Sequence, residues 1–165
     1  MPDLEILVDF STWLVFWYFV MAFAEYLIHK HTMHKRKRWL PYWVFKHHAI
    51  DHHKDGRHDL NIDLPIWMHL SIGSPLIAAS YLIGGWVCTI PLLITFFYHS
   101  YIWTHMHRAI HDLEDHWITK TNYYKRAKKH HLDHHKRPAT NFGVVFLWTD
   151  YIFGTKLNES IKKHR

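Results

Sequence analysis

Residues 10–34 read FSTWLVFWYFVMAFAEYLIHKHTMH, and this stretch contains both kinds of segment from which the chain is built. Its apolar part, residues 10–28, would span about 28 Å as an α-helix, close to the roughly 30 Å of a bilayer's hydrocarbon core. The part that follows carries three histidines, and residues 35–38 are all basic. Basic flanks are typical of the cytoplasmic end of a membrane-spanning helix. The stretch therefore predicts a transmembrane helix that presents histidines on the cytoplasmic side.

Two further apolar stretches, residues 64–83 and 86–103, are separated only by Gly84-Gly85. Paired glycines are a turn signal, and so short a connection predicts an antiparallel helical hairpin. The polar ends of both helices should then face the same side of the membrane.

The polar segments, residues 29–63 and 105–155, carry most of the lysines and arginines, so the positive-inside rule places both in the cytoplasm. We predict an all-α integral membrane helical bundle of about three spans, one single span plus a hairpin. A cytoplasmic helical cap would carry the histidines. The length of 165 residues indicates a single domain, residues 1–165.

Composition narrows the kinds of site that the chain can form. Its single cysteine, Cys88, rules out a disulfide within the chain and a thiolate metal site. Histidine is the outlier, with 19 residues, and imidazole is the commonest side-chain metal ligand. The formal charge of +6 would suit a nucleic acid or a membrane surface. Three apolar stretches of bilayer length argue against a nucleic-acid binder.

Most histidines fall into four clusters, at residues 29–34, 47–53, 105–116 and 130–135. Residues three and four apart share a helix face, so two or three imidazoles from each cluster can converge. That gives about ten nitrogens, too many for one metal ion but suited to two. The ten best-placed residues are His29, His34, His48, His52, His53, His107, His111, His131, His134 and His135.

Several assignments remain open within these clusters. His47 competes with His48, and His116 competes with His107 as the partner of His111, although a spacing of five residues shares a helix face poorly. Carboxylates commonly fix the tautomer of metal-bound histidines, and two acidic residues stand in the right places for that role. Those two are Asp112 and Asp133. The remaining histidines are isolated, and we interpret them as structural or surface residues: His58, His69, His99 and His164.

The motifs resemble the fatty acid hydroxylase/sterol desaturase superfamily of membrane di-iron enzymes. The segment Glu25-Tyr26-Leu-Ile-His29 with His34 is similar to the first histidine box, and residues 131–135 match H-x2-H-H. The downstream segments Asn141-Phe-Gly and 148–155 resemble fatty acid 2-hydroxylases. The compact length and box order also resemble β-carotene hydroxylases. The second box departs from the pattern, because it reads H-x3-H-H from His48.

The resemblance implies two iron ions, O2 as co-substrate, and hydroxylation of a C–H bond in a membrane lipid or fatty acyl chain. Zinc could replace iron in purified protein. Desaturation of a lipid, sterol or carotenoid is the alternative within the superfamily. A non-catalytic membrane metal-binding or transport protein is the alternative of another class, and its ligands should lie inside the spans.

Electrons for such a reaction would come from a separate ferredoxin or cytochrome, since the chain has no flavin or haem motif of its own. The basic segment 120–137 could dock an acidic donor or contact anionic lipid headgroups. No nucleic-acid partner is expected, and the sequence leaves the oligomeric state open.

Overall fold

The computed structural model describes residues 2–58 and 66–158, and every regular element in these ranges is a helix. The all-α prediction is therefore confirmed. The side chains of residues 2–3 and 66–72, which include His69, fall outside the description, as does His164. The elements are α1 (Pro2–Ile28), η1 (His29–Met33), α2 (Tyr42–Phe45), η2 (Lys46–Lys54), α3 (Ile66–Ile110), η3 (Trp117–Lys120), α4 (Asn122–Lys136) and α5 (Thr149–Ile152).

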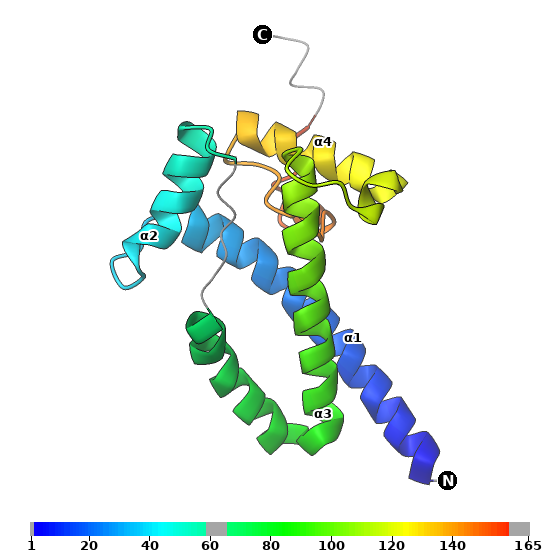
Figure 1. Ribbon diagram of the computed structural model, residues 1–165. Coiled ribbons are helices and arrows are strands. Elements are labelled where there is room, and N and C mark those ends of the chain that lie inside the picture. The colour runs from blue at the N-terminus through cyan, green and yellow to red at the C-terminus, as the bar shows by residue number, and fades with distance from the viewer. Residues whose placement is uncertain (1, 59–65, 159–165) are drawn as a thin grey trace. The chain divides into compact units, whose positions relative to one another are not determined.

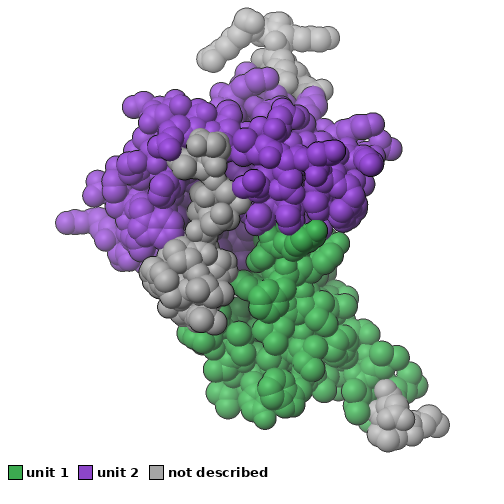
Figure 2. Space-filling view, in the orientation of Figure 1, with its two compact units in different colours: residues 1–21, 63–101 green, residues 22–62, 102–165 purple. Residues whose placement is uncertain are grey.

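The chain divides into two compact units, drawn in different colours in Figure 2. Unit 1 comprises Met1–Met21 and Asp63–Tyr101, and unit 2 comprises Ala22–Ile62 and Ile102–Arg165. All four histidine clusters lie wholly in unit 2. All of the candidate metal ligands are therefore in one unit.

In unit 1, α3 reverses direction at Gly84-Gly85, as Figure 1 shows. Both residues have non-helical backbone angles, and Gly85 has φ +57°, a conformation that glycine adopts without steric cost. The Ser80 and Thr89 hydroxyls meet across the reversal at 3.1 Å. The two arms of α3 thus form the hairpin that the paired glycines predict.

The first part of α1 also belongs to unit 1, where the Trp17 indole N–H donates to the Cys88 carbonyl over 3.0 Å. Gly84 permits the tight reversal, because a Cβ there would lie 2.7 Å from the Cys88 Cβ, and the same Cβ would lie 3.5 Å from the Trp13 indole of α1. Large apolar side chains on the other faces remain exposed, for example Leu82 at 84% and Phe97 at 65%. Apolar surface of this extent is unusual in a soluble monomer.

Within the residues that the structure describes, two segments are long and apolar enough to cross a membrane, Leu4–Met33 and Gly73–Ile110. The second includes the glycine reversal, so the number of spans, about three by sequence, stays a prediction. Together with the exposed apolar side chains, these segments indicate a membrane protein.

Unit 2 has a small core where α4 packs against the C-terminal turns of α3. The Tyr124 hydroxyl donates to the Ala109 carbonyl over 2.7 Å and joins the two helices. Thr121 caps α4 by accepting from the Tyr124 N–H at 3.1 Å, an ordinary role for threonine at a helix start. The buried core residues are Ile102, Met106, Ala109, Ile110, Ile118, Tyr124 and Ala127.

Candidate metal centre

The first two histidine clusters lie on π-helical segments, η1 and η2. In a π-helix the backbone bonds join residues five apart, as in the bond from the His34 N–H to the His29 carbonyl. Residues five apart therefore share a face here. This geometry pairs His29 with His34, and His48 with His53.

Five imidazoles from three elements and the turn after η1 converge in what we call the first histidine group. One ligand nitrogen from each lies within 4.8 Å of all the others. The Nε2 atom of His48 is 2.8 Å from that of His29 and 3.1 Å from that of His34. The members of the first histidine group are His29, His34, His48, His53 and His134.

These nitrogen–nitrogen distances fit the coordination shell of a metal ion. A metal about 2.05 Å from each nitrogen sets neighbouring nitrogens about 2.9 Å apart at right angles and about 3.4 Å apart in a tetrahedron. The Nε2 contacts in the group range from 2.8 to 3.3 Å. A neutral imidazole has only one N–H, so mutual hydrogen bonds cannot account for all of them.

A second histidine group lies beside the first and consists of His52, His107, His111 and His131. The His131 Nε2 atom is 3.2 Å from that of His111 and 3.1 Å from that of His135. The His107 Nε2 atom is buried and has no hydrogen-bond partner among the described residues. A buried polar atom without a partner is costly, and a metal ion would satisfy it.

Burial keeps these imidazoles neutral, which is the state that binds metal. Desolvation, reinforced by neighbouring imidazoles, lowers the pKa of His34 to about 3, of His111 to about 3 and of His135 to about 2. The same causes hold the pKa of His131 well below its usual range. At neutral pH the site therefore offers uncharged nitrogens with free lone pairs.

Two backbone carbonyls fix the tautomers in the first histidine group. The His29 Nδ1–H donates to the Phe142 carbonyl, and the His134 Nδ1–H donates to the Thr140 carbonyl over 2.6 Å. Each ring consequently turns its Nε2 lone pair toward the other histidines. Such support around a ligand orients the ring and raises its basicity.

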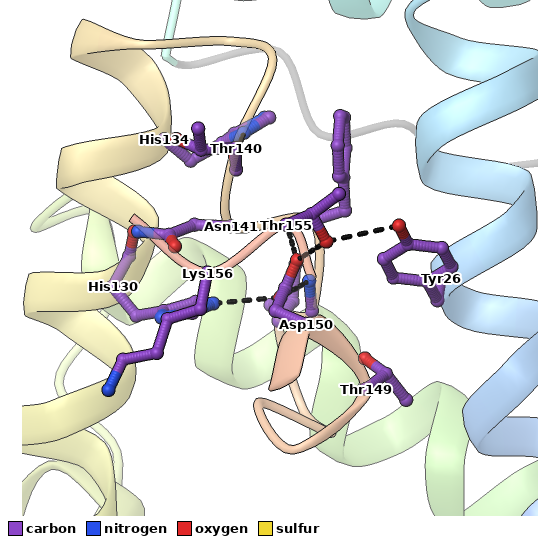
Figure 3. A network of polar contacts seen from close by, with 12 residues as sticks. Tyr26, His130, His134, Thr140, Asn141, Thr149, Asp150, Thr155 and Lys156 are labelled. Atoms are coloured by element: carbon purple, nitrogen blue, oxygen red, sulfur yellow. Dashed lines mark hydrogen bonds and ion pairs between the residues drawn. The ribbon is translucent and has the colours of Figure 1, made fainter. Parts of the chain in front are cut away.

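The loop that supplies these carbonyls is held by Asp150, which stands between α4 and α1 in Figure 3. Its carboxylate accepts from the Phe142 N–H at 2.8 Å, the Gly143 N–H at 2.7 Å and the Thr155 hydroxyl at 2.7 Å. It also accepts from His130 Nε2 at 2.9 Å. Burial alone would raise the pKa of Asp150, but these hydrogen bonds outweigh it and the pKa is lowered.

A second carboxylate, Glu25, anchors the same loop to α1. Its Oε1 atom accepts from three consecutive backbone N–H groups, those of Val144 at 2.7 Å, Val145 at 3.0 Å and Phe146 at 3.2 Å. Because Glu25 precedes His29 by one helical turn, it sets the position of the loop carbonyl relative to the His29 ring.

The structure brings together all ten histidines that the spacing indicated. The pairing differs in one respect: His52 lies in the second histidine group, whereas His48 meets His53 at 3.2 Å in the first. On an α-helix, His48 would instead share a face with His52, four residues on. The π-helical backbone of η2 is the physical reason for the change.

The alternative residues lie elsewhere. His47 is half-exposed and pairs with Asp51 at 3.2 Å. His116 stacks on His105, which contacts Glu114 at 2.5 Å, and these three form a separate cluster. Of the two proposed supporting carboxylates, Asp112 contacts Lys128 and Asp133 contacts Lys129.

Two contributors to the site lie outside the four histidine clusters. Asp150 follows the Asn141-Phe-Gly segment by seven residues, and an acid placed after a glycine-containing loop is the one sequence signal that could have indicated a loop anchor. His58 was interpreted as an isolated histidine, yet its ring lies 4.4 Å from that of His111. Its spacing of five residues from His53 could have included it in the second cluster.

In a comparison with protein families, a model described as fatty acid hydroxylase matches residues 14–155. That range includes every member of both histidine groups and the loop that supports them. Comparison with curated proteins and with solved structures gives no match.

Proposed function

Because the chain belongs to the fatty acid hydroxylase family, we propose that it is an O2-dependent di-iron hydroxylase. Its substrate would be a membrane lipid or fatty acyl chain. The observation that carries the proposal is the presence of two adjacent groups of largely buried, neutral imidazoles. The family is known for histidine boxes that bind iron, and imidazole suits iron well.

Two bound iron ions would supply the activation of dioxygen and the oxidation of an unactivated C–H bond. The first histidine group would hold one ion, and the second group together with His135 would hold the other. The Phe142 and Thr140 carbonyls keep two of the rings in the metal-binding tautomer. Burial of the histidines keeps water from competing for these nitrogens and for the reacting centre.

Electrons would come from a separate acidic donor protein, and α4 offers a surface for it. Four lysines of α4, with Asp133 among them, line a groove of about 390 Å³, on a different face of the helix from the buried His131 and His134. A donor bound there would be separated from the histidines by one helix, about 10 Å across. We call this the lysine face, and its members are Lys125, Lys128, Lys129 and Lys136.

Lipid analysis of cells tests the reaction. Cells expressing the intact chain should accumulate a lipid that is heavier by one oxygen atom, and cells expressing His131→Ala should not. His47→Ala is the matched control, because His47 lies in neither histidine group. A lipid lighter by two hydrogen atoms would instead identify a desaturase, and an unchanged lipid profile would contradict both reactions.

Metal analysis supplies a second measurement. The purified chain should contain two metal ions, counted as iron plus zinc because imidazole accepts both. His131→Ala should reduce this content while the protein stays in the membrane. A chain that binds two metals but modifies no lipid would indicate the metal-binding or transport alternative.

A further inference from the structure

His58 follows η2 in a turn that brings the chain back toward the histidines. The Asp55 and Arg57 N–H groups donate to the Ile50 and Asp51 carbonyls over 2.8 and 2.9 Å. Gly56 between them has φ +67°, in the region that favours glycine. This backbone arrangement places His58 against the second histidine group, although it lies outside every histidine box motif.

The ring of His58 contacts three histidines of the site. Ring centroids are 4.4 Å from His111, 5.2 Å from His135 and 5.3 Å from His52. Ligand nitrogens of His58, His111 and His135 all lie within 4.8 Å of one another. His58 thus lies at the accessible edge of the site and faces three histidines from three different segments of the chain.

The two metal positions differ in the number of imidazoles around them. The first histidine group has five members. The second has four, and His135 approaches it through His131 at 3.1 Å. With His58 on the flank formed by His111 and His135, six imidazoles surround or border the second position, one more than the first.

We propose that His58 is an additional, replaceable ligand of the second metal ion. Bound as a further imidazole beside His111 and His135, His58 would occupy a position that an oxygen ligand could otherwise take. His58 is the member best suited to leave, because it lies on a turn while the other five lie on helices or at the end of one. Its departure would open one coordination position without dismantling the site. The inference rests on the metal centre of the proposed function but not on its chemistry.

The test compares three variants of the full-length protein, loaded with cobalt(II) as a spectroscopic probe. His58→Ala removes the ligand, and His58→Phe keeps an aromatic ring beside His111 but has no nitrogen to donate. His47→Ala is the matched control from the same segment. Both His58 variants should still bind two cobalt ions, with stronger visible absorption for one of them, because five-coordinate cobalt absorbs more strongly than six-coordinate cobalt.

Chelator competition gives the second measurement. One of the two ions should leave both His58 variants at least about tenfold faster than it leaves the His47→Ala protein, given that even residues supporting a ligand change metal affinity by about 10–100-fold. Added imidazole should restore the absorption of His58→Ala. Unchanged spectra and release rates would overturn the proposal, as would loss of both ions, which would make His58 a structural residue.

These outcomes separate the inference from the proposed function. A clear His58 signature in a protein that oxidises no lipid would count against hydroxylation alone. Unchanged cobalt binding in an active hydroxylase would count against the role of His58 alone.

Discussion

The loop beside the first histidine group contains three consecutive residues with different structural roles, Asn141, Phe142 and Gly143. The Asn141 side chain joins α4 to the tail, donating to the His130 carbonyl at 3.1 Å and accepting from the Leu157 N–H at 2.7 Å. Asn141 has φ +57°, which asparagine tolerates better than most residues. The Phe142 carbonyl orients His29. Single residues outside the histidine boxes therefore determine the orientation of the ligand rings.

Gly143 is the residue whose substitution tests this support most directly. A Cβ at this position would lie 2.6 Å from the Phe146 carbonyl oxygen and 3.1 Å from Asp150 Oδ2, so the loop would have to shift. We expect Gly143→Ala to lower the affinity for metal by about 10–100-fold, the range for residues that support a ligand. Chelator competition would measure this.

Gly73→Ala is the control for that substitution, because a Cβ there would meet nothing within 4 Å. Metal affinity in Gly143→Ala equal to that in Gly73→Ala would show that the loop does not orient the ligands.

At the scale of elements, η2 explains how the irregular second box still forms a site. The box has one residue more than the usual H-x2-H-H spacing. The extra residue is accommodated by π-helical bonding, in which residues five apart share a face. His48 and His53 therefore meet at 3.2 Å despite a spacing that would separate them on an α-helix.

Deletion of Ala49 tests this interpretation of η2. Without it, His48 and His53 would be four residues apart and could share a face of an ordinary α-helix. We expect the deletion variant to retain two metal ions. An insertion of one alanine at the same place should lose an ion from the first histidine group, because no regular helix pairs residues six apart. Metal content of the purified variants measures both, and loss of metal from the deletion variant would contradict the interpretation.

The helix α4 presents histidines and lysines on different faces, which predicts a separate effect on electron delivery. Lys125→Glu combined with Lys136→Glu should raise the KM for an acidic donor and weaken its dependence on salt, since charge mainly steers association. Metal content and turnover with a small chemical reductant should stay unchanged.

The same double charge reversal distinguishes a protein donor from lipid headgroups. Unchanged kinetics with the donor, together with weaker binding to vesicles of anionic lipid, would show that the lysine face contacts the membrane instead.

At the scale of the whole molecule, the apolar helices of unit 1 predict how the protein partitions. Leu82, Trp86 and Phe97 are largely exposed, and such a surface is stable only when lipid covers it. We expect the chain to remain in the membrane pellet after washing with alkaline carbonate and to need detergent for extraction. Release by carbonate alone would contradict an integral membrane protein.

The sequence by itself determined the all-helical fold, the reversal at Gly84-Gly85 and the ten histidines that meet. These follow from local rules: apolar length, the backbone freedom of glycine, and the recurrence of imidazoles at close spacing. The ligands of a histidine box can be predicted from the sequence because they lie close together on one helix.

Only the tertiary structure decided how those histidines divide between two groups and what supports them. His52 and His53 are adjacent in sequence, yet His53 joins the first histidine group and His52 the second, because the π-helical bonding of η2 brings His53 onto the face of His48. Glu25 bonds the loop after α4 across more than a hundred residues, and Asp150 bonds that loop from α5. Such contacts form between segments that are distant in the sequence and meet only in the folded chain, so residue spacing does not predict them.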